Sequence, residues 1–218
     1  MINQLRACSS ACLLIAYCLF TSAITYLTQS FLITNDVLHN SYAEQLSYDR
    51  IEEMISGQTK WAWVNFVILP IIYAIKFFLV ACCILVGSMF FDIKLKFSEA
   101  FKIALLADVV FIIPILIKVF WFLVVQKDYV LQDLQLFSPL SILSIFDANT
   151  LGILWFYPLQ ILNVFELIYI FLLGFWVYQF GAKSYEKGLN MVIASYIPGL
   201  IIWIILVMFV TLNLNPAA

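Results

Sequence analysis

Five long apolar stretches alternate with shorter polar segments along the chain. They cover residues 8–33, 63–90, 101–125, 159–180 and 189–212. Each exceeds the ~20 residues that an α-helix needs to cross a hydrocarbon layer about 30 Å thick at a rise of about 1.5 Å per residue. The pattern therefore predicts an all-α fold, a polytopic transmembrane bundle of about five spanning helices, with residues 1–218 forming a single integral membrane domain.

The two longest polar segments predict structure outside the spans. In residues 34–62, apolar side chains recur near helical spacing from Leu46 to Ile55. This spacing predicts a short outer amphipathic helix that ends at Gly57. In residues 126–158, polar and apolar residues alternate and prolines interrupt the pattern. We expect an interfacial or re-entrant hairpin there.

Composition supports a membrane protein. Hydrophobic residues make up 65% of the chain and charged residues 11%, whereas soluble domains average roughly 45–50% and about 25%. The first apolar stretch is longer than the roughly 7–15 residues of a signal-peptide core, so we interpret it as a retained membrane helix. A net charge of −2 gives no nucleic-acid-binding footprint. We therefore expect the lipid bilayer, and a membrane protein of unknown identity, as partners, and no nucleic acid.

The positions of the basic residues predict the orientation. A cytoplasmic N-terminus places six of them on the cytoplasmic side: Arg6, Lys94, Lys96, Lys102, Lys183 and Lys187. The opposite side then holds Arg50, Lys60 and Lys127, and its first loop is long and acidic. Because cytoplasmic loops carry an excess of Lys and Arg, this distribution predicts a cytoplasmic N-terminus and a C-terminus outside.

Four ionisable residues lie inside the apolar stretches: Lys76, Asp108, Lys118 and Glu166. A charge at this depth costs from about 2.5 kcal/mol upward and usually faces the interior of a bundle. Their approximate depths predict that Lys118 pairs with Glu166 and that Lys76 pairs with Asp108. The pairs either neutralise charge and hold the helices in register, or line a path for conduction or substrate.

Three prolines lie within the predicted spans, at Pro70, Pro114 and Pro198. Proline removes a helical hydrogen bond and kinks the helix, so these positions are candidate kinks. Kinks that shape the packing of the bundle are the simpler interpretation, and a gating hinge is the alternative.

Catalytic motifs are missing from the sequence. It contains no G-x-S-x-G, Walker A, H-E-x-x-H or C-x-x-C pattern, and His39 is its single histidine. The five cysteines lie within or at the edges of apolar stretches, where they are expected to pack as small apolar side chains. We therefore expect no catalytic residues, no metal site and no cofactor. A lipid-modifying enzyme with an unrecognised site remains an alternative.

The second half of the chain resembles the Yip family (Ypt-interacting protein family) of five-span membrane proteins, in its bacterial form. The resemblance covers about residues 97–212 and is carried by FSEAFK at 97–102, FIIP at 111–114, NVFELIY at 163–169, KSYEKG at 183–188 and SYIP at 195–198. It implies a five-helix, non-enzymatic protein of the bacterial inner membrane. Eukaryotic members carry a cytosolic N-terminal region that has no counterpart here, so binding of Rab-type GTPases is not implied.

These observations lead to two functional hypotheses. The first is a non-catalytic protein with a structural, assembly or accessory role in a bacterial cytoplasmic membrane. The alternative is a small permease or transport subunit, in which Lys118, Glu166, Lys76 and Asp108 line a polar path.

Overall fold

The computed structural model describes residues 9–43, 45–146 and 151–214, and in these residues the regular structure is helical, with no β-strand. The elements are α2 (Ser10–Leu32), α3 (Asn35–Tyr42), α4 (Tyr48–Phe90), α5 (Phe97–Asp108), η1 (Val109–Phe111), α6 (Ile112–Phe120), η2 (Trp121–Val125), α7 (Leu131–Leu136), η3 (Ile142–Ile145), α8 (Ile153–Ile161), α9 (Val164–Phe180) and α10 (Tyr185–Leu214).

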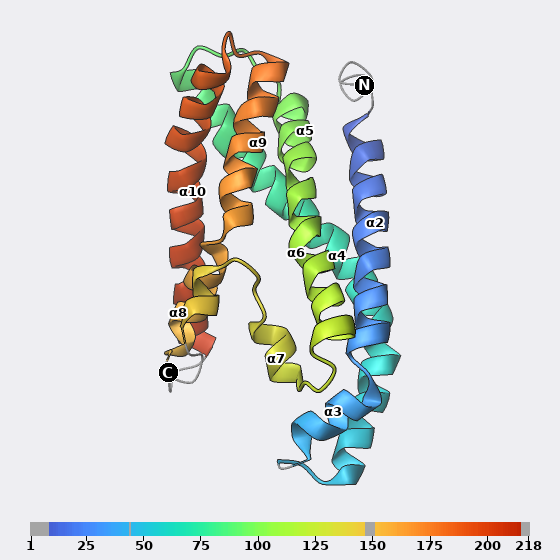
Figure 1. Ribbon diagram of the computed structural model, residues 1–218. Coiled ribbons are helices and arrows are strands. Elements are labelled where there is room, and N and C mark those ends of the chain that lie inside the picture. The colour runs from blue at the N-terminus through green and yellow to red at the C-terminus, as the bar shows by residue number, and fades with distance from the viewer. Residues whose placement is uncertain (1–8, 44, 147–150, 215–218) are drawn as a thin grey trace.

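Four helical stretches in the described residues are long and apolar enough to cross a membrane: α2, α4, the run from α5 through η2, and α10. The predicted all-α membrane bundle is confirmed at this level. The fourth predicted stretch, residues 159–180, corresponds mainly to α9, which has 17 residues. In Figure 1, α2, α5, α9 and α10 stand side by side and α4 crosses them diagonally, with the start of α2 and the end of α10 at opposite ends of the bundle.

α4 is much longer than one membrane crossing. Its 43 residues span about 64 Å at about 1.5 Å per residue. Trp61 and Trp63 are 62% and 61% exposed, and exposed tryptophans of a membrane helix favour the headgroup region. The 13 residues before Trp61 therefore extend beyond the bilayer, where α3 packs against them.

The prediction that the outer helix ends at Gly57 is wrong, because α4 runs through this residue without interruption. A glycine ends a helix when it adopts a left-handed conformation, and none of the described glycines has a positive φ. The helix that packs on this part of α4 is α3, which begins at Asn35 after Thr34. The Thr34 hydroxyl accepts a hydrogen bond from the Val37 amide at 3.4 Å.

The predicted third helix, residues 101–125, is divided in the structure. It starts earlier, at Phe97, and contains the 3₁₀ turn η1 and the π-helical turn η2. Pro114 has no N–H to donate to the carbonyl of Val110, so the regular hydrogen-bond ladder is interrupted next to η1. The other two candidate kinks, Pro70 and Pro198, lie within α4 and α10, which are each assigned as one helix.

The predicted fourth helix, residues 159–180, is also divided, so this single-helix prediction is wrong. α8 ends at Ile161 and α9 begins at Val164. The Asn163 side chain caps α9 by accepting a hydrogen bond from the Glu166 amide at 2.8 Å. The backbone at the break pairs instead with the preceding loop, through bonds from Ile142 N to Leu162 O at 2.9 Å and from Val164 N to Leu140 O at 3.1 Å.

The buried side chains form two clusters of different size. The main core joins α2, α4, α5, α9 and α10, and its largest fully buried members include Phe77, Ile84, Ile103, Tyr169 and Leu173. The small core consists of Leu32, Phe122 and Leu134, at the opposite end of α2. α6 lies between the two cores and has no buried residue.

Helices α9 and α10 approach closely at two glycines. A Cβ added to Gly188 would lie 2.9 Å from the carbonyl oxygen of Gly174 and 3.2 Å from the amide nitrogen of Tyr178. Small residues allow membrane helices to approach until their backbones touch, which increases van der Waals contact where no hydrophobic driving force exists. This contact fixes α10 against the half of α9 that carries the main core.

Candidate functional site

An ion pair joins α4 to α5 inside the bundle. Lys76 Nζ lies 2.5 Å from Asp108 Oδ1, and Asp108 is completely buried, whereas the Lys76 side chain is 37% exposed. The hydroxyl of Tyr17, on α2, donates a hydrogen bond of 2.6 Å to Asp108 Oδ2. Lys76 therefore serves the one carboxylate oxygen that has no hydrogen-bond partner of its own.

Aromatic rings surround this ion pair. Lys76 Nζ lies 4.4 Å from the ring centroid of Phe111 and 5.9 Å from that of Tyr169. A cation within about 6 Å of a ring is attracted to its negative face, more strongly when it is desolvated. Tyr17 packs edge-on against Tyr73 and Phe77. The rings of Phe111 and Tyr169 thus help to hold the ammonium beside Asp108.

Glu166 is held separately. Its Oε1 accepts a hydrogen bond of 2.7 Å from the hydroxyl of Tyr196 on α10, and it lies in the first turn of α9. Negative groups are favoured at this end of a helix, which carries a partial positive charge. The carboxyl also interacts electrostatically with Lys76 and Asp108. We name Tyr17, Lys76, Asp108, Glu166, Tyr169 and Tyr196 the polar cluster.

The structure brings Lys76 and Asp108 together but not Lys118 and Glu166. No ion pair of Lys118 is present in the described part of the chain, and the pairing predicted for Lys118 is not formed there. The physical reason is the break at η1, after which α6 contacts α2 and η2 and diverges from α9. The predicted depths of Lys118 and Glu166 assumed two continuous neighbouring helices. In the structure, the first is interrupted at η1 and the second between α8 and α9.

Tyr169 contributes an unusual polar group. Its side chain is completely buried, and its hydroxyl has no hydrogen-bond partner among the described residues. Its ring packs against those of Phe111 and Tyr196, at centroid distances of 5.1 Å and 5.5 Å. A buried hydroxyl without a hydrogen-bond partner costs free energy, so Tyr169 is an unusual member of a packed core.

The polar cluster lies at membrane depth. Asp108 and Tyr196 each lie 11 residues from the start of α5 and α10, which corresponds to about 16 Å along the helix. Lys76 and Glu166 each lie 14 residues from the end of α4 and α9, or about 21 Å. All four distances are measured from the same end of the bundle (Figure 1), so the cluster lies about 16–21 Å along the helices from that end.

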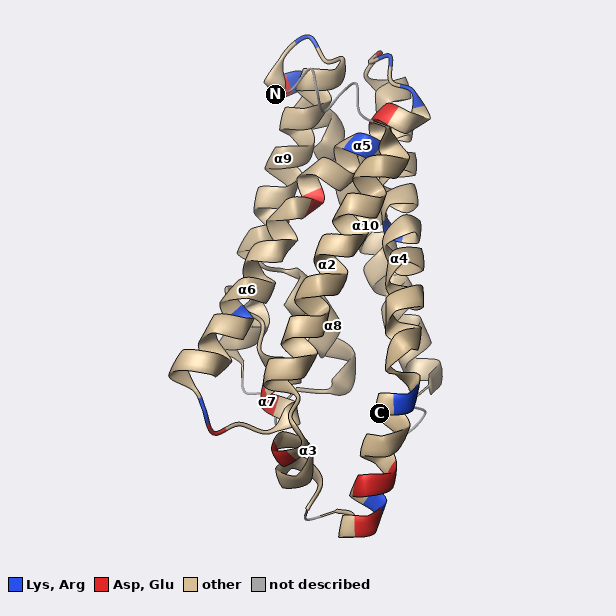
Figure 2. Ribbon diagram, turned by 90° about the vertical axis from the view of Figure 1, so that its right-hand side faces the viewer, with Lys and Arg blue, Asp and Glu red and all other residues tan. Residues whose placement is uncertain are grey.

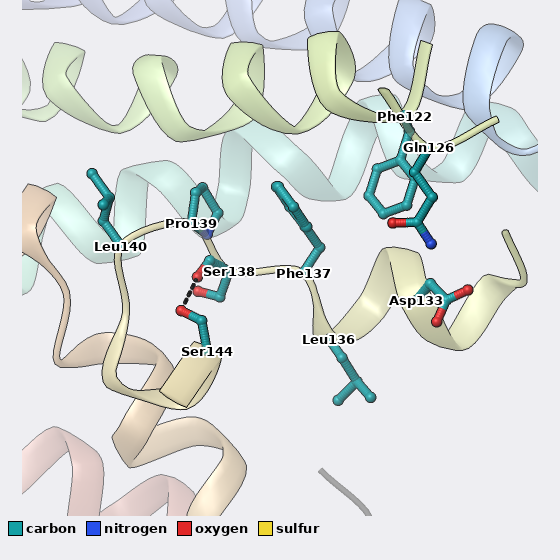
Figure 3. A pocket seen from close by; sticks show the side chains of 9 residues that line it. All are labelled: Phe122, Gln126, Asp133, Leu136, Phe137, Ser138, Pro139, Leu140 and Ser144. Carbon is teal, nitrogen blue, oxygen red and sulfur yellow. Dashed lines mark hydrogen bonds between the residues drawn. The ribbon is translucent and has the colours of Figure 1, made fainter. Parts of the chain in front are cut away.

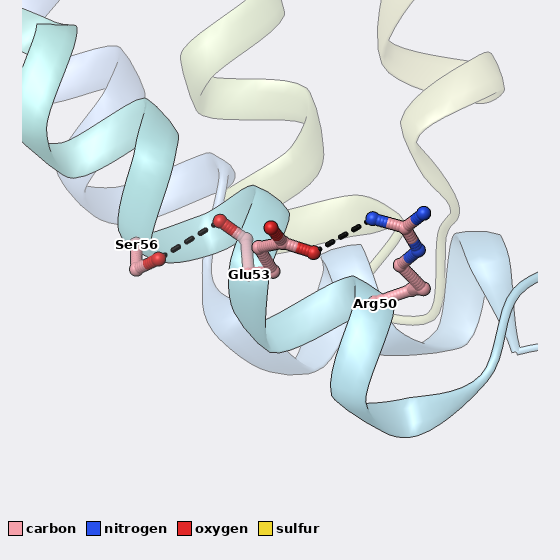
Figure 4. Close-up of polar contacts among 3 residues, drawn as sticks. All are labelled: Arg50, Glu53 and Ser56. Carbon is pink, nitrogen blue, oxygen red and sulfur yellow. Dashed lines mark hydrogen bonds and ion pairs between the residues drawn. The ribbon is translucent and has the colours of Figure 1, made fainter.

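Most other charges lie at the two ends of the bundle (Figure 2). Beyond the membrane, His39 Nε2 and Glu52 Oε1 are 3.0 Å apart. In the same region, Arg50 donates a hydrogen bond of 2.8 Å to Glu53 (Figure 4). Glu52 therefore contacts His39, and Glu53 contacts Arg50. No group of three His, Cys, Asp or Glu residues that could hold a metal occurs in the described ranges.

A shallow pocket of 360 Å³ lies where the segment after α7 passes α6 (Figure 3). The only ionisable residue that lines it is Asp133, whose carboxylate caps α7 by accepting a hydrogen bond from the Val130 amide at 3.0 Å. Ser144 is nearby, but its hydroxyl donates to the carbonyl of Ser138 at 3.0 Å. The pocket therefore lacks a paired nucleophile and base.

Comparison with protein families, curated proteins and solved structures gives no significant match. The polar cluster must therefore be interpreted from its own geometry.

The sequence analysis missed the tyrosines of the cluster. Tyr17, Tyr169 and Tyr196 supply its hydroxyls, but in an apolar stretch tyrosine resembles any other aromatic residue. One available signal was the requirement of each buried carboxylate for hydrogen-bond donors. Since one lysine cannot satisfy two separate carboxylates, hydroxyl donors on neighbouring helices were needed.

Proposed function

We propose that this protein is a non-catalytic integral membrane protein with a structural, assembly or accessory role in a bacterial cytoplasmic membrane. The observation that supports this proposal is the connectivity of the polar cluster. Its members come from α2, α4, α5, α9 and α10, and the Lys76–Asp108 ion pair balances its own charge. Such a cluster fixes the arrangement of five helices with respect to one another.

Fixing an arrangement differs physically from conducting a solute. Both carboxylate oxygens of Asp108 are engaged and the residue is fully buried, so the ion pair is not available to exchange partners at low cost. The close α9–α10 contact at Gly174 and Gly188 also restricts movement of α10 relative to α9. A rigid bundle is suited to holding another membrane protein in place.

The proposed topology has five crossings, and α8 together with α9 forms the fourth along the chain. At the end of the bundle proposed to face the cytoplasm, the segments 91–102 and 181–187 carry five lysines: Lys94, Lys96, Lys102, Lys183 and Lys187. The other end carries the acidic start of α4. The positive-inside rule then favours a cytoplasmic N-terminus and a C-terminus outside. Membership of the Yip family remains a prediction that agrees with this topology.

A second candidate function is a small permease or transport subunit. The break between α8 and α9 is the specific observation that favours it. The break leaves the N-terminus of α9 and the carboxyl of Glu166 inside the bundle. Transporters commonly build midplane sites from such discontinuous helices.

The two candidates can be separated with Lys76→Met, Asp108→Asn and the double variant, each purified in detergent. A structural ion pair predicts that each single variant loses stability and that the double variant recovers part of the loss, with a coupling of about 0.5–3 kcal/mol. Vesicles containing the double variant should then behave like wild-type vesicles in a proton or solute flux assay. Single variants as stable as the wild type but deficient in flux would instead support the permease.

A further inference from the structure

The polar cluster contains more acids than bases. Asp108 and Glu166 are both carboxylic acids, and Lys76 is the cluster's single basic residue. Lys118, the other basic residue at membrane depth, forms no ion pair in the described part of the chain. If every group were ionised, the cluster would carry one uncompensated negative charge in a medium where such a charge is strongly unfavourable.

The contacts show which acid lacks compensation. Asp108 has the ammonium of Lys76 at 2.5 Å and the Tyr17 hydroxyl at 2.6 Å. Glu166 accepts a single side-chain hydrogen bond, from the neutral hydroxyl of Tyr196. The N-terminus of α9 adds only about half a positive charge, which is less than a carboxylate requires. Glu166 therefore shares a single cation, Lys76, with Asp108, and Lys76 forms its ion pair with Asp108.

We propose that Glu166 is a proton-binding site in the middle of the membrane and that it carries the proton that makes the cluster neutral. The protonated carboxyl keeps the bond that it accepts from Tyr196 and gains one O–H to donate. Tyr169 lies three residues later on the same face of α9, and its buried hydroxyl lacks a partner among the described residues. Among the described buried side-chain oxygens of α9, it is the one without a hydrogen-bond partner.

The groups around Glu166 on every adjoining helix support this assignment. They are Tyr157 on α8, Tyr169 on α9, Tyr196 on α10, Lys76 on α4 and Asp108 on α5. Three of them are neutral hydroxyls, and the remaining two form the ion pair. The proton on Glu166 therefore depends on Asp108, because a neutral residue at position 108 leaves the charge of Lys76 available to balance an ionised Glu166.

Infrared spectroscopy tests the proposal on the full chain in phosphatidylcholine vesicles at neutral pH in sodium-free buffer. A protonated carboxylic acid has a carbonyl stretch that is separate from the carboxylate bands and shifts in D₂O. The wild type should show this band, and Glu166→Gln should lose it. This variant still accepts the bond from Tyr196, so it should remain folded. The matched control Glu186→Gln, at an exposed position of α10, should keep the band.

A second variant tests the dependence on Asp108. In Asp108→Asn the band of Glu166 should disappear, because Lys76 then balances the ionised carboxylate. The proposal is overturned if the wild type has no such band or if the band survives in Glu166→Gln, which would assign the proton to another carboxyl. A band that vanishes on adding sodium also overturns it, by identifying a metal cation as the compensating charge. Neither proposed function is required for this result.

Discussion

Two halves of the bundle differ in how they accommodate polar groups. One half contains α5 and α9, and the other contains α6, α7 and α8. The first buries charged and hydroxyl groups in the polar cluster and surrounds them with fully buried apolar residues. The second satisfies its polar backbone through 3₁₀ and π turns, capped short helices and a β-bridge between Ser141 and Asn163. Its buried core has only three residues.

The comparison teaches that a buried ion pair and complete packing occur together in this chain. Bonds from Tyr17 to Asp108 and from Tyr196 to Glu166 join residues far apart in sequence, and each requires its helices to be fixed. In the second half, the long-range bonds from Tyr129 to Leu32 and from Leu131 to Ser41 lie outside the main core, and the backbone forms breaks and short helices. The two halves should therefore differ in stability, and each of the following predictions tests that difference.

Removing the cation of the cluster should have the largest effect. Lys76→Met leaves the fully buried Asp108 and the partly buried Glu166 without a base, and breaking a buried ion pair costs about 3–5 kcal/mol. The free energy of unfolding, measured by denaturant titration in mixed micelles, should fall by that order.

Lys118→Met is the matched control for this substitution. It removes a partly buried lysine that forms no ion pair in the described residues, so stability should not fall. A comparable loss in Lys118→Met would show that both halves depend on buried charge and would remove the distinction between them.

Truncating one phenylalanine in each core should give unequal losses. Phe77 is fully buried between the rings of Tyr17 and Phe101, and Phe77→Ala should cost about 3 kcal/mol through the cavity that it leaves. Phe122→Ala empties a three-residue core that can open locally, so α7 should exchange its amide hydrogens faster while global unfolding changes less. Equal global losses would contradict a difference between the cores.

A methyl group added to the α9–α10 contact should destabilise the bundle by about 1–3 kcal/mol, because Gly188→Ala places a Cβ against backbone atoms that cannot move aside. At Gly57 an added Cβ would contact nothing within 4 Å. Gly57→Ala should therefore raise stability by about 0.5–1 kcal/mol through helix propensity. Thermal unfolding of the two variants measures the loss of stability expected for Gly188→Ala and the gain expected for Gly57→Ala. A loss in Gly57→Ala would show that α4 makes contacts at Gly57 that an added methyl group disturbs.

The smallest effect is expected at Tyr129, whose hydroxyl donates a hydrogen bond of 3.0 Å to the carbonyl of Leu32. Tyr129→Phe should cost about 1 kcal/mol. Burial raises the pKa of Tyr129 above the usual tyrosine value of 10.0. The folded state thus retains this proton at higher pH than the unfolded chain, and its stabilisation is complete below pH 10 and disappears as pH rises through the higher folded pKa.

Tyr129→Phe should therefore abolish the part of the stability loss at alkaline pH that comes from ionisation of Tyr129. Limited proteolysis of the 126–131 segment as a function of pH provides the measurement. An identical alkaline profile in wild type and Tyr129→Phe would assign the loss to other groups.

The sequence predicted the helical membrane bundle because apolar length alone decides that property. It also predicted where α2 and α10 lie to within a few residues, since these helices have no internal break. It did not predict the division at Leu162–Asn163, because this break depends on backbone pairing with Leu140 and Ile142, which are distant along the chain. The proximity of Lys76 and Asp108 followed from depth, whereas the expectation for Lys118 failed once α6 diverged.

Because α4 is one helix on both sides of Trp61, a tilt about that residue moves both of its ends. The arm outside the membrane has 13 residues, and Lys76 lies 15 residues beyond Trp61 on the inner arm, at about 22 Å. A tilt of about 5° around Trp61 would displace Lys76 by about 2 Å. That displacement is comparable with the 2.5 Å separation of Lys76 and Asp108. A force applied to the outer arm would therefore be transmitted mechanically to the charges at the centre of the bilayer.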